Sequence, residues 1–190
     1  MTQRDLLHAA DDFTRRRISP KRYTHTLGVA DTAEHLATLH GIDPERARLA
    51  ALLHDAAREL KPEDLLRLAK EWSPPVGESE RQSPKLLHGP VAADLVKREL
   101  GIEDEGVLEA IRVHTTGKPE MGPLALILFV ADKIEPGRDY PSVGHLRELA
   151  ERDLRKAAAG VLRRAIDYNR ERSTPTHPST LETLEWLEES

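Results

Sequence analysis

A histidine and an aspartate, His54 and Asp55, stand side by side in the otherwise apolar segment 51–57, which reads ALLHDAA. An apolar helix has no structural use for two adjacent polar side chains, because burial removes their hydration and leaves their polar atoms in need of partners. The pair therefore restricts the chain to folds that bring other polar side chains to the same buried place.

Four further side chains of the same chemistry lie in comparable apolar or helix-edge settings, namely His25, His88, His114 and Asp132. At helical spacing, His25 shares an apolar stripe with Val29. In the same way His114 continues the stripe of Ile111, so that both rings point toward the core. Asp132 follows the apolar segment 124–131, where burial of an unpaired carboxylate costs several kcal/mol.

Each of these residues, taken singly, also fits a core side chain that hydrogen-bonds to the backbone. As a set, they indicate convergence on one interior site. Imidazole nitrogens and carboxylate oxygens are the donors expected for one or two first-row divalent metals, and a cation compensates the charge of a buried carboxylate. The sequence therefore predicts a buried metal site whose ligands are His25, His54, Asp55, His88, His114 and Asp132.

Helical periodicity runs along the whole chain and alternating strand patterns are hard to find, so we predict an all-α fold. Prolines stand where a first helical turn tolerates them, at Pro20, Pro44 and Pro62. The segment 73–80, rich in proline, glycine and serine, is expected to be irregular and mobile. We expect helices at about 3–17, 20–40, 44–58, 62–71, 90–100, 104–115, 121–135, 142–150, 151–172 and 179–188.

A chain of 190 residues is long enough for one well-packed core and short for two. We therefore predict a single domain over residues 1–190, with its core at about 20–135 and C-terminal helices at about 142–188 packed on that core. The last helix carries an apolar stripe that packs either on the body of the chain, which we expect, or on a second copy in a homodimer. Its members are Leu181, Leu184, Trp186 and Leu187.

The overall composition narrows the range of partners. The formal net charge of −5 gives no reason to expect a nucleic-acid polymer, because proteins that bind one usually carry a basic patch. The chain has no cysteine, which excludes disulfides and thiolate metal sites. It shows neither a signal peptide nor a membrane-spanning stretch, so we expect a soluble, cytoplasmic protein without a membrane partner.

The order of a first histidine, a His-Asp pair and a distant aspartate resembles the signature of the HD-domain metal-dependent phosphohydrolases. Longer matches resemble the YqeK family in the same order and over nearly the whole chain. These are the segments 22–30, 86–91, 111–117 and 129–139, which read RYTHTLGVA, LLHGPV, IRVHTTG and FVADKIEPGRD.

This resemblance implies a helical HD-domain bundle and a bacterial di-metal enzyme, commonly iron-loaded, that cleaves diadenosine tetraphosphate symmetrically to two ADP. Carried over to this chain, one metal would be held by His25, His54, Asp55 and Asp132. Asp55 would bridge to a second metal held by His88 and His114. A carboxylate suits a bridge because each of its two oxygens can bind one ion. Manganese, cobalt and zinc suit the same donors as iron, so the metal stays open.

The resemblance also implies contacts to the substrate phosphates. The candidate catalytic residues are Asp55, Arg58 and Arg138, and the candidate substrate-binding residues are Arg58, Lys85, Thr115, Lys118 and Arg138. Arg58 stands where the family usually has lysine, and an arginine can clamp a phosphate but hardly transfer a proton. Lys118 stands where arginine is more common. A solvated surface charge is an equal alternative for Lys85 and Lys118.

Two other functions remain open at the level of the sequence. One is an HD-domain nucleotidase or pyrophosphatase that acts on mononucleotides. The other is a non-catalytic module that binds a metal or a nucleotide. The presence of all six candidate ligands argues against a purely structural metal site, which fewer ligands usually close.

Overall fold

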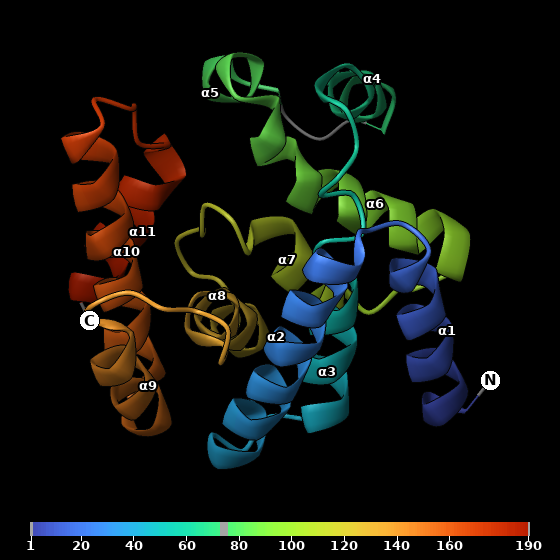
Figure 1. The fold of residues 1–190 in the computed structure, drawn as a ribbon, viewed down its shortest axis with the longest axis horizontal. Helices are drawn as coiled ribbons and strands as arrows, with labels where there is room; N and C mark the ends of the chain where they lie inside the picture. Colours follow the sequence, from blue (N-terminus) through green and yellow to red (C-terminus); the bar gives the residue numbers. More distant parts are fainter. Residues whose placement is uncertain (1, 73–75, 190) are drawn as a thin grey trace.

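The protein, seen here as a computed structural model, is described over residues 2–72 and 76–189. Within these ranges every regular element is a helix, and the all-α prediction is confirmed (Figure 1). The elements in chain order are α1 (Gln3–Arg15), α2 (Pro20–Leu39), α3 (Pro44–Leu53), α4 (Pro62–Trp72), α5 (Glu78–Gln82), the short 3-10 helix η1 (Pro84–Leu87), α6 (His88–Leu100), α7 (Glu105–Val113), α8 (Pro123–Ile134), α9 (Val143–Arg152), α10 (Leu154–Glu171) and α11 (Pro178–Glu188).

The segment 73–80, predicted to be irregular, is only partly described, since residues 73–75 lie outside the described ranges. The prediction is wrong for residues 78–80, which begin α5. The Glu80 carboxylate stabilises this helix start by accepting the Gly77 backbone N–H at 2.8 Å. It also lies 2.8 Å from Nε2 of His177, at the start of α11. This second contact joins distant parts of the chain, which local composition does not reveal.

Two helices end earlier than their predicted limits of 58 and 115. α3 ends at Leu53 and α7 ends at Val113, so that His54 and His114 are the first residues beyond them. In both cases the ring Nδ1 donates to the backbone carbonyl three residues earlier, at 2.6 Å for His54 and 2.7 Å for His114. The imidazole thus occupies a carbonyl oxygen that would accept a backbone N–H if the helix continued. Both histidines are therefore presented from turns.

Local capping sets the starts of the helices that carry the site. Asp43 caps α3, and Asp104 caps α7 by accepting the backbone N–H groups of the first turn. Arg46 of α3 also donates to both carboxylate oxygens of Asp104, at 2.8 and 2.6 Å. This bidentate pair ties the first turn of α3 to the N-cap of α7.

Helix α8 is the centre of the core. Every residue from Leu124 to Asp132 is buried, which matches its nearly uninterrupted apolar sequence. α8 packs against α2, α3 and α7, and also against α9 and α10. Figure 1 shows it nearly end-on, between the α2 and α3 pair and the helices α9 to α11. A polar residue on α8 is therefore held deep inside the molecule.

The apolar stripe of the last helix packs mainly on its own chain, through the contact of α11 with α10. Leu187 is buried, and Leu184 and Trp186 pack partly buried against the core, whereas Leu181 is 49% exposed. Over the described ranges, no helix combines the length and the apolar character that crossing a membrane requires.

Candidate metal centre

The structure brings the six predicted ligand side chains together from five parts of the fold. His25 comes from the second turn of α2, His54 and Asp55 from the turn after α3, His88 from the first residue of α6, His114 from the turn after α7 and Asp132 from α8. His25 is partly buried and the other five are buried. A polar cluster of this size inside an apolar bundle needs a compensating charge or a dense set of hydrogen bonds.

The carboxylate of Asp55 divides the cluster into two sets. Its Oδ2 lies 3.9 Å from Nε2 of His25 and 3.5 Å from Nε2 of His54. Its Oδ1 lies 3.3 Å from Nε2 of His88 and 3.8 Å from Nε2 of His114. The two oxygens of one side chain thus face two different pairs of histidines, which is the arrangement that a bridging carboxylate needs.

Asp132 completes the first of these sets. Its Oδ1 lies 3.0 Å from Nε2 of His25 and 3.8 Å from Nε2 of His54. The ligand atoms of Asp55, His88 and His114 form the second set, all within 4.8 Å of one another. The site therefore offers four donors on one side and three on the other, with Asp55 in both.

The four histidines present the same ring nitrogen to the centre. Nδ1 of His54, His88 and His114 contacts a backbone carbonyl three residues earlier, at 2.6, 2.5 and 2.7 Å. Nδ1 of His25 contacts Oε1 of Glu135 at 3.0 Å. Because carbonyl and carboxylate oxygens only accept, each Nδ1 carries a proton, and each ring presents its Nε2 to the centre. Outer partners of this kind orient metal-ligating histidines.

The inward nitrogens have few hydrogen-bond donors around them. Nε2 of His54 is buried without a hydrogen bond among the described residues, and Nε2 of His25 faces the carboxylate of Asp132 at 3.0 Å. Nε2 of His88 and of His114 lie 2.9 Å apart, although both rings hold their proton on Nδ1. Two lone pairs at this distance repel each other unless a cation or a proton lies between them. The donor set therefore fits divalent metal ions.

The close approach of α6 and α7 depends on Gly89, next to His88. A Cβ at position 89 would lie 2.9 Å from the carbonyl oxygen of Arg112 and 3.0 Å from that of Ile111. A side chain there would push the start of α6 away from the end of α7. Glycine thus allows the His88 and His114 rings to meet.

The charge states of two buried histidines and of the two carboxylates also suit metal binding. Burial lowers the pKa of His54 and holds the pKa of His114 well below its usual value, so both rings are neutral near pH 7. Burial raises the pKa of Asp55, but the neighbouring imidazoles, His54 first, outweigh it and the net pKa is lowered. For Asp132, burial is outweighed by Lys133 and then by His25, which also lowers its pKa. Neutral imidazoles and ionised carboxylates are the forms that bind metal.

Three charged residues at the centre were not predicted as site residues. Arg22 lies 3.3 Å from Oδ2 of Asp55, and Lys133 forms an ion pair with Oδ2 of Asp132. Glu135 is buried beside His25. The sequence spacing could have indicated two of them as neighbours of the ligands. Arg22 precedes His25 by about one helical turn, and Glu135 follows Asp132 by three residues.

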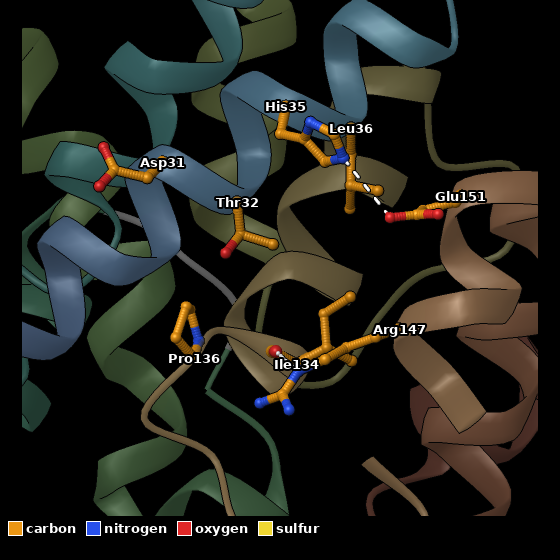
Figure 2. Close-up of a pocket in the computed structure, with 8 residues that line it drawn as sticks. All are labelled: Asp31, Thr32, His35, Leu36, Ile134, Pro136, Arg147 and Glu151. Carbon is orange, nitrogen blue, oxygen red and sulfur yellow. Dashed lines mark hydrogen bonds and ion pairs between the residues drawn. The ribbon is translucent and has the colours of Figure 1, made fainter. Parts of the chain in front are cut away.

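The turn that contains Glu135 is held by an arginine of α9. Arg147 donates to the backbone carbonyls of Ile134 at 2.8 Å, of Glu135 at 2.9 Å and of Arg138 at 3.0 Å. Figure 2 shows this arginine beside Ile134 in a hollow of about 300 Å³ between α2, α9 and the end of α8. None of the six candidate ligands lines that hollow. The hollow is thus a neighbour of the centre, and Arg147 supports the turn that carries Glu135 and Arg138.

The predicted substrate-binding residues lie in different places. Oγ1 of Thr115 is 3.4 Å from Nε2 of His88 and 3.3 Å from Nε2 of His114. Arg138 donates through Nη2 to Oδ1 of Asp132 at 3.0 Å. These two residues border the metal centre.

The other three predicted contacts have less direct positions. The ammonium of Lys85 lies 3.3 Å from the carbonyl oxygens of Arg58 and Leu60, and Lys118 pairs with Glu109 at 2.9 Å on the surface. Arg58 is partly buried three residues after Asp55, and its guanidinium makes no ion pair within the described ranges. None of these three side chains makes a hydrogen bond or an ion pair with a candidate metal ligand among the described residues.

Comparison with known proteins agrees with this architecture. The profile of the HD domain family matches residues 22–137. A Bacillus subtilis protein named symmetrical bis(5'-nucleosyl)-tetraphosphatase is 38% identical, covering 91% of this chain and 92% of the relative. A Halalkalibacterium halodurans protein of the same name is 40% identical, covering 90% of each chain.

A solved structure shows the same fold along nearly the whole chain. It is the crystal structure of a predicted HD superfamily hydrolase involved in NAD metabolism from Clostridium acetobutylicum. The two chains are 37% identical and superpose with a TM-score of 0.93, covering 96% of each. This chain therefore belongs to the HD-domain family, in the group of relatives named symmetrical bis(5'-nucleosyl)-tetraphosphatase.

Proposed function

We propose that this protein is a metal-dependent phosphohydrolase that cleaves diadenosine tetraphosphate symmetrically into two ADP. The observation that carries the proposal is the position of Asp55, whose two oxygens face two separate pairs of histidines. The relatives named for this activity support the choice of substrate, because they match almost the whole chain. The proposal includes a bacterial, cytoplasmic enzyme.

The donor set suits two divalent cations. One would be held by His25, His54, Asp55 and Asp132, and the other by Asp55, His88 and His114. Bound there, such cations supply an activated water near neutral pH and neutralise charge on the phosphates. Iron is our choice of metal, because the family resemblance favours it, while nitrogen and oxygen donors suit manganese, cobalt and zinc as well.

The protein side chains would bind and orient the polyphosphate. Arg138 and Arg22 place guanidinium groups beside the two carboxylates of the centre, where they can donate to phosphate oxygens. Thr115 adds a hydroxyl donor between the second pair of histidines. Arg58 can reach the same region from the turn after Asp55. We assign catalytic roles to Asp55, Arg58 and Arg138.

Symmetrical cleavage has a simple balance. One water molecule bonds through its oxygen to one of the two inner phosphorus atoms, the bond from that phosphorus to the central bridging oxygen breaks, and two ADP leave. Such a transfer needs in-line positioning and charge neutralisation more than covalent chemistry by the protein. The basic side chains around a buried anionic centre meet that need.

The test combines metal analysis with product identification. The metal content of protein purified without added metal is measured first, and the protein is then incubated with diadenosine tetraphosphate. Chromatography should show ADP as the sole product, and treatment with a chelator should remove the activity. ATP with AMP would contradict symmetrical cleavage. Hydrolysis of mononucleotides in place of the dinucleotide would favour a nucleotidase or pyrophosphatase, and bound metal without turnover of any nucleotide would favour a binding module.

A further inference from the structure

A second hollow lies beside the metal centre, between the end of α8 and α10. It has a volume of about 310 Å³, and we call it the α8–α10 hollow. Lys133, Arg138 and Tyr140 line it on one side, and Arg164, Tyr168 and Asn169 of α10 line it on the other. A hollow of this size lies at the small end of ligand sites and suits one nucleoside better than a whole dinucleotide.

Two of its lining residues connect this hollow directly to the centre. Lys133 and Arg138 both contact the carboxylate of Asp132. Arg138 also lines a separate hollow of about 340 Å³ that includes His25 and Arg22. A phosphate held at the centre by Arg138 would therefore lie at the entrance of the α8–α10 hollow.

The two tyrosine rings that line the α8–α10 hollow each pack against a guanidinium group. The hydroxyl of Tyr140 donates to the carbonyl oxygen of Lys133 at 2.7 Å, which fixes the position of the ring. The guanidinium of Arg164 lies 3.8 Å from the centre of that ring. Tyr168 is 46% exposed, and the guanidinium of Arg172 lies 4.4 Å from the centre of its ring. Flat rings and guanidinium planes are the surfaces on which nucleic-acid bases stack.

We propose that the α8–α10 hollow binds a purine nucleoside of the substrate, with Tyr168 as a stacking residue. The identity of this occupant rests on the proposed function, since a dinucleoside polyphosphate has a nucleoside at each end of its phosphates. The carboxamide oxygen of Asn169, at the edge of the hollow, is an acceptor that can meet the exocyclic amine of adenine. The hollow shared by His25 and Arg22 is lined also by Lys21 and Glu59 and contains no aromatic side chain other than histidine.

Calorimetric binding tests the proposal without turnover. Protein reconstituted with Mn²⁺ is titrated with ADP, which has the base, and with inorganic tripolyphosphate, which has phosphates alone. Tyr168→Ala should weaken ADP binding by about 5- to 150-fold, the range expected for loss of one stacked base. Tyr168→Phe keeps the ring and should restore the wild-type Kd. Tripolyphosphate should bind all three proteins with similar Kd. Leu39→Ala is the control for loss of an exposed apolar side chain elsewhere.

Other outcomes overturn the proposal. The first is a Tyr168→Ala variant that binds ADP with the wild-type Kd. The second is a variant whose binding of ADP and of tripolyphosphate is weakened equally. The third is a wild-type protein that does not bind ADP. A separate assay of the wild-type protein with diadenosine tetraphosphate separates this proposal from the proposed function. Binding of ADP that depends on Tyr168, without cleavage of the dinucleotide, would keep the nucleoside site and reject the reaction. Cleavage of the dinucleotide by the wild-type protein, together with ADP binding that does not depend on Tyr168, would keep the reaction and reject the nucleoside site.

Discussion

Arg147→Met should destabilise the protein and weaken the metal centre together. Arg147 is half-buried and donates to three backbone carbonyls between Ile134 and Arg138. A net value of about 0.5–1.5 kcal/mol for each of the three hydrogen bonds gives a loss of about 1.5–4.5 kcal/mol in the free energy of unfolding. The released turn carries Glu135, which orients His25, so metal affinity or turnover should fall by about tenfold or more.

Urea unfolding followed by circular dichroism measures the first effect, with a chelator present so that bound metal adds no stability. Metal per chain and the kcat for diadenosine tetraphosphate measure the second. The matched control is Arg152→Met, an exposed arginine of the same helix, which should cost less than about 0.5 kcal/mol. Equal free energies of unfolding for the two variants would refute the role of Arg147 in stability. A lower stability with unchanged metal content and kcat would show that the turn does not position the centre.

Three substitutions and one pH series extend these tests. Asp55→Ala should abolish hydrolysis and lower the bound metal without changing the helical content, because it removes the carboxylate shared by both sets of ligands. Wild-type turnover in this variant would reject the di-metal centre. His114→Ala should lose about one metal per chain first, and equal loss of both would mean that the sites fill together. Arg138→Lys should lower kcat more than it raises KM, since lysine lacks the forked donors of arginine. Arg46 lowers the pKa of Asp104, so the stability that Asp104→Ala removes should be present above pH about 4 and should shrink as the pH falls through the lowered pKa. A difference that stays constant with pH would assign that stability to the uncharged part of the cap.

The sequence alone indicated the class of fold and the composition of the site. Helical periodicity and prolines at first turns are local signals, and they located α2, α3 and α4 at their starts. Polar residues in apolar settings are unfavourable without partners, so His54 and Asp55 signalled a cluster before any contact was known. The same argument selected all six side chains that the fold brings together.

The ends of helices were harder to predict because side chains compete with the backbone for the same carbonyls. His54 and His114 each take a carbonyl through Nδ1, which ends α3 and α7 and also sets the ring orientation. The start of α5 depends on Glu80, which His177 contacts from a distance of about half the chain. The hydrophobic periodicity of the sequence does not indicate these hydrogen bonds.

The tertiary structure alone decided how the site is organised. The two oxygens of Asp55 can face different histidines only because α2, α3, α6 and α7 meet around them. The supports of the centre, Glu135 and Arg147, act across helices through contacts that follow no sequence period. The α8–α10 hollow likewise joins Arg138 to Tyr168. Residue chemistry is local and can be read along the chain, whereas distances between distant side chains depend on how the helices pack.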